Sequence, residues 1–174
     1  MTDTSLEIEM HAGIADVATN SVVCQTIADA WAEVGPVNFS DEAKAAAKHI
    51  APCVPGCDVN DPLNDNVPVF VKANFCVPAS SDVGDVSYCV PTGALTYITN
   101  VKATAMHSWQ MVAQTRSAIA HEGTINCAKV MALAGLKFIM DPALVEAAWK
   151  EHKDNGLVYD CLMPADLKPK LDRK

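Results

Sequence analysis

The sequence lacks an excess of positive charge and lacks a long apolar run. It carries 13 Lys and Arg against 21 Asp and Glu, which gives a formal net charge of −8. Nucleic-acid binding requires a basic face, so this balance argues against a nucleic-acid partner. No apolar run approaches the roughly 20 residues that span a bilayer, and the first residues show none of the features of a signal peptide. We therefore expect a cytoplasmic protein that binds neither nucleic acid nor membrane.

Regular cysteine spacing is also missing. The seven cysteines are an odd number and follow no repeat, which predicts free thiols in a reducing compartment for a chain without a secretion signal. Cys53 and Cys57 form the one close pair, but three residues separate them rather than the two of a C-x-x-C site. No second pair completes a four-ligand zinc site. The cysteines therefore favour neither a structural zinc site nor a redox site.

What the sequence does contain is the pattern of a globular domain with helices. Half of its 174 residues are hydrophobic and a fifth are charged, so it can bury a core of its own. Capping residues and helical spacing of apolar residues predict four helices. The first follows Asn20 and ends at Gly35-Pro36, the second follows Ser40 to about Ile50, the third follows Ser117 to about Met140, and the fourth starts at Asp141-Pro142.

Several short segments rich in β-branched and aromatic residues predict strands between these helices. They are residues 6–10, 67–71, 86–90 and 95–98. Residues 51–66, with their prolines, glycines, Asp and Asn, predict a loop. Together the elements predict an α/β fold in which helices pack on a short mixed sheet.

Two polar motifs lie in the middle of the chain. Residues 80–87 read S-S-D-V-G-D-V-S, and residues 107–110 read H-S-W-Q. In this order and spacing they resemble the C-terminal part of the co-catalytic zinc amidohydrolases and peptidases, the family of carboxypeptidase G and the aminoacylases. Within that family, the resemblance is greatest to the B-type subunit of p-aminobenzoyl-glutamate hydrolase.

This resemblance implies a domain arrangement. In the family, a smaller lid domain that often dimerises interrupts an α/β catalytic domain. Residues 1–15 then correspond to the last strand of the lid domain, and residues 16–174 correspond to the C-terminal part of the catalytic domain. The resemblance also implies an enzyme that hydrolyses the amide bond of an N-acyl or aminobenzoyl amino acid, with water activated by two zinc ions.

His107 is the candidate metal ligand, because the histidine of the second motif binds metal in the family. A catalytic zinc normally needs three protein ligands plus water. The family's H-x-H, C-x-H-D and Glu-Glu segments, which hold its other ligands and its general base, do not occur in this sequence. We therefore expect one metal ligand, no catalytic residue, and an isolated chain that is inactive.

Four further residues are candidates for substrate contact or for orienting the metal ligands. Ser80 and Ser81 could donate hydrogen bonds to a substrate. Asp82 either bonds to nearby backbone N–H groups or orients a ligand, whereas for Asp85 we expect the structural role. His121 lies in a stretch similar to one in the B-type subunits, but a histidine on a helix surface is the simpler interpretation.

Three interpretations of the chain remain open. It is a fragment or separately encoded piece of a zinc amidohydrolase, a non-catalytic subunit that pairs with a catalytic chain, or a small binding domain that stands alone. A sheet without its other strands exposes an edge and an apolar face. We therefore expect a homo-oligomer or pairing with a chain that carries the missing half.

Overall fold

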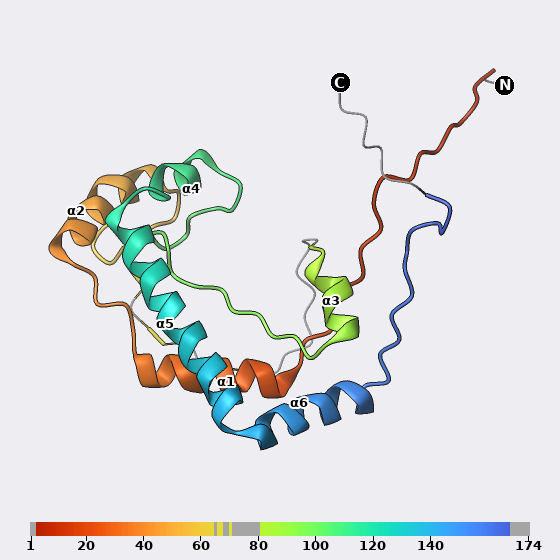
Figure 1. Cartoon of the computed structure of the whole chain (residues 1–174). Helices are drawn as coiled ribbons and strands as arrows, with labels where there is room; N and C mark the ends of the chain where they lie inside the picture. The colour runs from red at the N-terminus through yellow and green to blue at the C-terminus, as the bar shows by residue number, and fades with distance from the viewer. Residues whose placement is uncertain (1–2, 65, 68–69, 71–80, 168–174) are drawn as a thin grey trace.

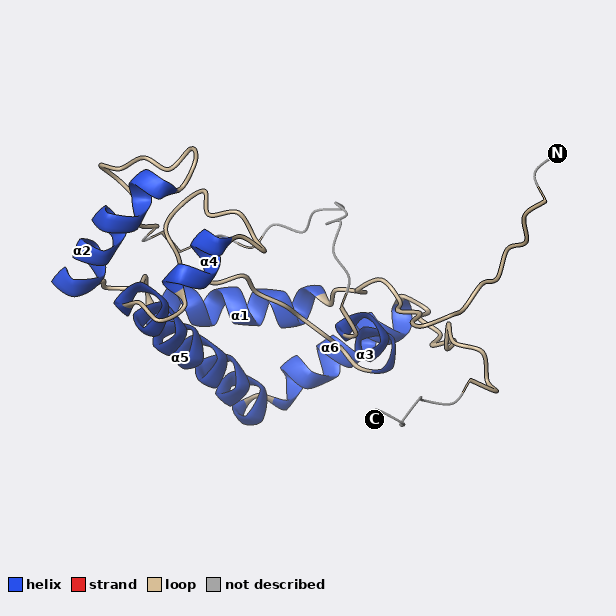
Figure 2. Cartoon of the chain, turned by 90° about the horizontal axis from the view of Figure 1, so that it is seen from above, coloured by secondary structure: helices blue, strands red, loops and turns tan. Residues whose placement is uncertain are grey.

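The computed structural model describes residues 3–64, 66–67, 70 and 81–167, and this part of the chain is built from helices (Figures 1 and 2). The elements in chain order are α1 (Ser21–Val34), α2 (Asp41–Ile50), a short 3-10 helix (Ala51–Cys53), α3 (Val83–Cys89), α4 (Trp109–Gln114), α5 (Ala118–Met140) and α6 (Pro142–Asp154). The four predicted helices are confirmed as α1, α2, α5 and α6. Helices α3 and α4 are additions that the sequence did not predict.

The predicted caps explain where the four long helices begin. Asn20 starts α1, where its side chain accepts a hydrogen bond of 3.1 Å from the Val23 N–H. Ser40, Ser117 and Asp141 accept equivalent bonds at the starts of α2, α5 and α6. Each bond satisfies one of the backbone N–H groups that a helix start leaves without a partner. At the other end of α1, Gly35 has φ +82, a conformation that glycine adopts without strain.

Helix α5 is the element on which the other long helices pack. It contacts α1, α2 and α6, and α1 also contacts α6. Near its start, Gly123 lets the backbone come close: a Cβ at this position would lie 1.8 Å from the carbonyl oxygen of Ile98. The segment that contains Ile98 therefore runs directly against the helix, at a small residue of α5 that permits close packing.

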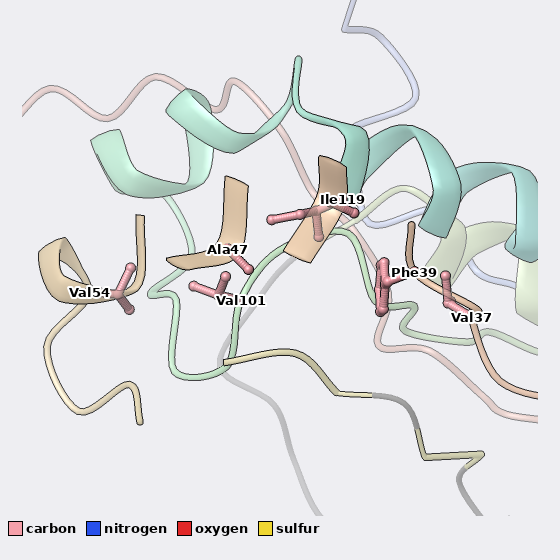
Figure 3. Close-up of a cluster of buried hydrophobic side chains, with 7 residues drawn as sticks. Val37, Phe39, Ala47, Val54, Val101 and Ile119 are labelled. Carbon is pink, nitrogen blue, oxygen red and sulfur yellow. The ribbon is translucent and has the colours of Figure 1, made fainter. Parts of the chain in front are cut away.

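Two clusters of buried side chains form the core. One lies between α2, the start of α5 and residues 37, 39, 54 and 101, and its largest members include Phe39, Val101 and Ile119 (Figure 3). The other joins α1 to the second half of α5 through Ile27, Trp31 and Val130 among others. Trp31 also stacks on Tyr97, with ring centroids 4.1 Å apart. Helix α5 contributes residues to both clusters, which explains why the other long helices pack on it.

The predicted strand at residues 86–90 is wrong, because residues 83–89 form α3. The β propensity of Val86, Tyr88 and Val90 is outweighed by contacts that need helical geometry. Helix α3 sets the side chains of Asp85, Ser87 and Tyr88 against residues 15–18. Propensity for strands depends on such surroundings more than propensity for helices does.

The other predicted strands and the sheet are not confirmed. Residues 6–10 and 95–98 form no strand, and a single parallel bridge between Thr19 and Thr92 is the β pairing within the described ranges. Residues 68, 69 and 71 of the strand predicted at 67–71 lie outside the described residues. An alternating segment needs a neighbouring strand to form a ladder, and residues 6–10 are exposed. The observed fold of the described part is therefore helical, and the division at residue 15 stays a prediction.

Candidate functional site

The first motif lies at the start of α3, where Ser81 and Asp82 are exposed. The Ser81 hydroxyl accepts a hydrogen bond of 3.3 Å from the Val83 N–H. Asp82 occupies the position before the helix, but its side chain makes no capping hydrogen bond. Ser81 thus has a turn role, and Asp82 presents its carboxylate to solvent. Ser80 lies outside the described residues.

The second half of this motif holds the segment that leads into α1. Asp85 accepts a hydrogen bond of 3.1 Å from the Ala15 N–H. The buried Ser87 hydroxyl accepts one of 2.9 Å from the Ala18 N–H and donates one of 2.6 Å to the Gly84 carbonyl. At Gly84 a Cβ would lie 1.8 Å from the Ala15 carbonyl oxygen, so only glycine permits this approach. The structural role expected for Asp85 is consistent with this geometry.

The Tyr88 hydroxyl completes this contact between α3 and the entry segment. It donates a hydrogen bond of 2.8 Å to Asp16, and this bond raises the pKa of the tyrosine. A phenol that donates to a carboxylate is favoured in its neutral form. No pattern in the sequence indicates this pairing, because 72 positions separate the two residues.

His107 lies at the tip of a loop just before α4. Its side chain is exposed, and its φ of +57 is in the left-handed region. Ala103 in the same loop has φ +61. Residues other than glycine seldom adopt this conformation, although histidine does so more often than most. The loop therefore presents the His107 side chain to solvent from a left-handed backbone conformation.

Gln114 holds this loop in place from the end of α4. It is buried, with 2% of its surface exposed. Its side-chain oxygen accepts a hydrogen bond of 2.8 Å from the Val101 N–H, and its amide nitrogen donates to the Thr104 hydroxyl at 3.1 Å and to the Gln110 carbonyl at 2.9 Å. Sequence reasoning missed Gln114, because a glutamine at a helix end carries no pattern that predicts burial.

Ser108 fixes the other end of the same loop. Its hydroxyl accepts a hydrogen bond of 3.2 Å from the Met111 N–H and donates one of 2.6 Å to the Ala105 carbonyl. The serine of the H-S-W-Q motif is thus the cap that starts α4. His107, the residue before this cap, therefore lies outside helix α4.

His121 lies in the first turns of α5, exposed, at the edge of an open hollow of about 420 Å³. Asn38, Glu122 and Lys129 also line this hollow. Glu122 accepts hydrogen bonds from the Ser40 N–H and hydroxyl, so it ties α5 to the start of α2. The helix-surface interpretation of His121 is consistent with its position.

The structure does not bring the candidate residues together. Helices α3 and α4 lie apart in both views (Figures 1 and 2), so the segments that hold the two motifs are separated in the fold. Across the described part of the chain, no group of three or more His, Cys, Asp or Glu side chains could hold a metal ion. A catalytic zinc needs three protein ligands. The described residues therefore do not form a zinc site by themselves.

The cysteines within the described ranges are free thiols, as predicted. Cys53, Cys89 and Cys161 are exposed, whereas Cys24 is buried. Burial raises the pKa of Cys24 and that of Cys127, because the thiolate loses its hydration. Neither of these two thiols has the lowered pKa of a nucleophile.

Comparison with known proteins finds a relative along nearly the whole chain. The chain is 28% identical to the B-type subunit of p-aminobenzoyl-glutamate hydrolase from Escherichia coli strain K12 over 194 aligned positions. The match covers 97% of this chain and 40% of the relative, so the chain spans less than half of the length of that protein. No protein-family model and no solved structure matches the sequence. The resemblance to p-aminobenzoyl-glutamate hydrolase that the two motifs indicated is thus confirmed beyond the motifs themselves.

Proposed function

We propose that this chain is part of a metal-dependent amidohydrolase that cleaves the amide bond of an N-acyl or aminobenzoyl amino acid. The observation that carries the proposal is the similarity to a p-aminobenzoyl-glutamate hydrolase along 97% of the chain. In the reaction, water adds to the amide carbonyl and the carbon–nitrogen bond breaks. p-Aminobenzoyl-glutamate would give p-aminobenzoate and glutamate.

His107 would supply one ligand to a zinc site, and polypeptide outside these 174 residues would supply the others. The surroundings of His107 support this division. Met106, Trp109 and Val112 are 75%, 62% and 69% exposed. Apolar side chains gathered on a surface are typical of a contact with further polypeptide. His107 thus lies where an additional chain or segment would cover it.

Ser81, Asp82 and His121 would contact substrate or orient ligands only in the assembled enzyme, and the same holds for Ser80. Ser81 and Asp82 precede α3 and His107 precedes α4, and these two helices lie apart (Figure 1). We propose that the isolated chain is inactive and that the active species pairs with a second copy or with a chain that carries the remaining part. The free thiols fit a cytoplasmic enzyme.

A hydrolysis assay tests this function. The chain is assayed with p-aminobenzoyl-glutamate by release of p-aminobenzoate, alone and after co-expression with the part of the E. coli relative that lies outside the match. We expect no turnover from the chain alone and turnover from the assembled pair. His107→Ala should lower kcat at least about 100-fold, because loss of a metal ligand removes the site.

His49→Ala is the matched control, since His49 is exposed on α2. It should leave the rate of the assembled pair unchanged. A stable assembled pair that hydrolyses neither p-aminobenzoyl-glutamate nor other N-acyl amino acids would contradict the proposal. So would full activity in the His107→Ala variant.

A non-catalytic partner of a complete hydrolase is the second candidate function. The observation in its favour is that the described residues hold no cluster of three potential metal ligands. In that case the chain would bind a complete hydrolase and change its stability or affinity for substrate, while His107→Ala would have no effect on the rate. The same assay with the complete E. coli relative in place of its unmatched part therefore tests this second function.

A further inference from the structure

Helix α5 is apolar on the side turned away from the core as well as on the buried side. Its buried residues include Ile119, Gly123, Val130 and Ala134. Six uncharged residues of the exposed side are called here the outer face of α5: Thr124, Ala128, Ala132, Gly135, Leu136 and Ile139. His121, Ile125 and Lys129 are exposed on the same helix. Leu136 is 50% exposed and Ile139 is 78% exposed. A helix that is apolar on all sides is normally buried on all sides.

Charges on α5 are few, and two of them point toward neighbouring helices. Lys137 pairs with Glu33 of α1, and Glu122 bonds to Ser40 at the start of α2. Figure 2 shows α5 along one edge of the molecule, with the other long helices on one side of it. The outer face of α5 thus contains no charged side chain and has no covering helix within the described residues, although the helix also carries the exposed Lys129.

Gly135 adds an observation of a different kind. A Cβ added there would meet nothing within 4 Å, so nothing among the described residues requires glycine at this position. Glycine in a helix interior is destabilising relative to alanine. With Ala132 one turn earlier and Ala128 two turns earlier, it forms a shallow strip that another backbone could approach closely. A close contact with another backbone would explain why a destabilising glycine stands at this position of the helix.

A bilayer is a poor occupant for this face, although α5 is long and apolar enough to cross one by length and composition. Core helices of soluble proteins share that property. Lys129 lies at the middle of the helix and is exposed, and a lysine at the centre of a bilayer is strongly unfavourable. A second copy would bring together two chains of net charge −8, which repel one another at long range.

The comparison points to a different occupant. The chain matches 40% of the E. coli p-aminobenzoyl-glutamate hydrolase relative, so a hydrolase of this type has more than half of its length outside the match. We infer that the outer face of α5 is the surface on which this remaining part of the hydrolase packs, with its closest approach at Gly135. The inference rests on the proposed function.

The test measures assembly and not activity. The chain is purified with the part of the E. coli relative outside the match, and the affinity of the pair is measured by sedimentation. Gly135→Leu fills the strip, and Ile139→Glu places a charge on the face. We expect a one-to-one complex with the natural sequence and at least about tenfold weaker binding for each variant, since every 1.4 kcal/mol is a tenfold change.

Two controls separate assembly from folding. Gly135→Leu has open space around its Cβ, so the thermal midpoint of the chain alone should be unchanged or higher. Val145→Glu changes a residue on α6 that is 39% exposed, and it should leave the complex unaffected. Loss of binding in Gly135→Leu with a normal thermal midpoint would therefore assign the contact to the outer face of α5.

Three results would overturn the inference. The folded chain forms no complex with the remaining part, both variants bind as the natural sequence does, or Ile139→Glu instead abolishes a homodimer or binding to phosphatidylcholine vesicles. A complex that depends on the outer face of α5 but hydrolyses no amide would leave this surface standing and refute the proposed function. The experiment therefore distinguishes failure of the docking surface on α5 from failure of the proposed function.

Discussion

At the scale of single residues, the first motif divides into two kinds of side chain. Asp85 and Ser87 hold the backbone of residues 15–18 through hydrogen bonds. Ser81 and Asp82 are exposed and make no such long-range bond within the described part of the chain. Turn chemistry could be predicted from the sequence at these positions, but not the segment that the motif binds, because that segment lies about 70 positions earlier.

Asp85→Ala should therefore lower the free energy of unfolding, by about 1–2 kcal/mol, since a hydrogen bond from a backbone N–H to a charged group is lost. Asp82→Ala is the matched control from the same turn. It should change that free energy by less than about 0.5 kcal/mol, as expected for a surface site. Urea unfolding followed by circular dichroism gives both values. Equal destabilisation by the two variants would mean that the motif does not act through residues 15–18.

Thiol labelling tests the burial of Cys24. At a pH of about 8, near the ordinary thiol pKa, an alkylating reagent should modify the exposed Cys53, Cys89 and Cys161 first. Cys24 should react only as the protein unfolds, because burial restricts access and raises its pKa. Peptide mass spectrometry over time gives the order of modification. Modification of Cys24 as fast as that of Cys53 would contradict the packing of α1 against the core.

At the scale of elements, the long helices were predictable and the short ones were not. Caps such as Asn20 and Ser117 act within three residues, so the sequence alone places the starts of α1 and α5. Helices α3 and α4 have seven and six residues and depend on distant contacts. The alternating segment at residues 6–10 predicted a strand, but a strand needs a neighbour that the described part does not provide.

Gln114→Leu should disorder the loop that carries His107. The substitution leaves the buried Val101 N–H without its acceptor, which costs about 1–3 kcal/mol. Hydrogen exchange should increase at residues 101–108 more than in α1. Gln25→Leu, at an exposed site on α1, is the control and should leave exchange in the loop unchanged. Unchanged exchange in the Gln114→Leu variant would show that Gln114 does not hold the loop.

Glu151→Ala tests how α6 supports the start of α1. The Glu151 carboxylate accepts hydrogen bonds of 3.0 and 3.1 Å from the Ser21 and Val22 N–H groups, and a negative charge there also suits the helix dipole. We expect a loss of about 1–2 kcal/mol in the free energy of unfolding. Glu146→Ala, on the exposed side of α6, should be nearly neutral. If the two variants unfold alike in urea, α6 does not cap α1.

At the scale of the whole molecule, the main feature is exposed apolar surface, which is consistent with a chain that matches only part of its relative. Residues around His107 and the outer face of α5 are apolar and exposed, and the chain matches 40% of its relative. The motifs could predict the resemblance from the sequence. They could not show that the candidate residues lie apart, because that depends on how α3 and α4 pack.

Zinc content tests the central claim most directly. It is measured by elemental analysis for the chain alone, for the chain assembled with the remaining part of the relative, and for the same assembly with His107→Ala. We expect well under one equivalent of zinc for the chain alone, bound zinc in the assembly, and a loss of zinc in the variant. A stable assembly without zinc, or one whose zinc content is unchanged by His107→Ala, would contradict this claim.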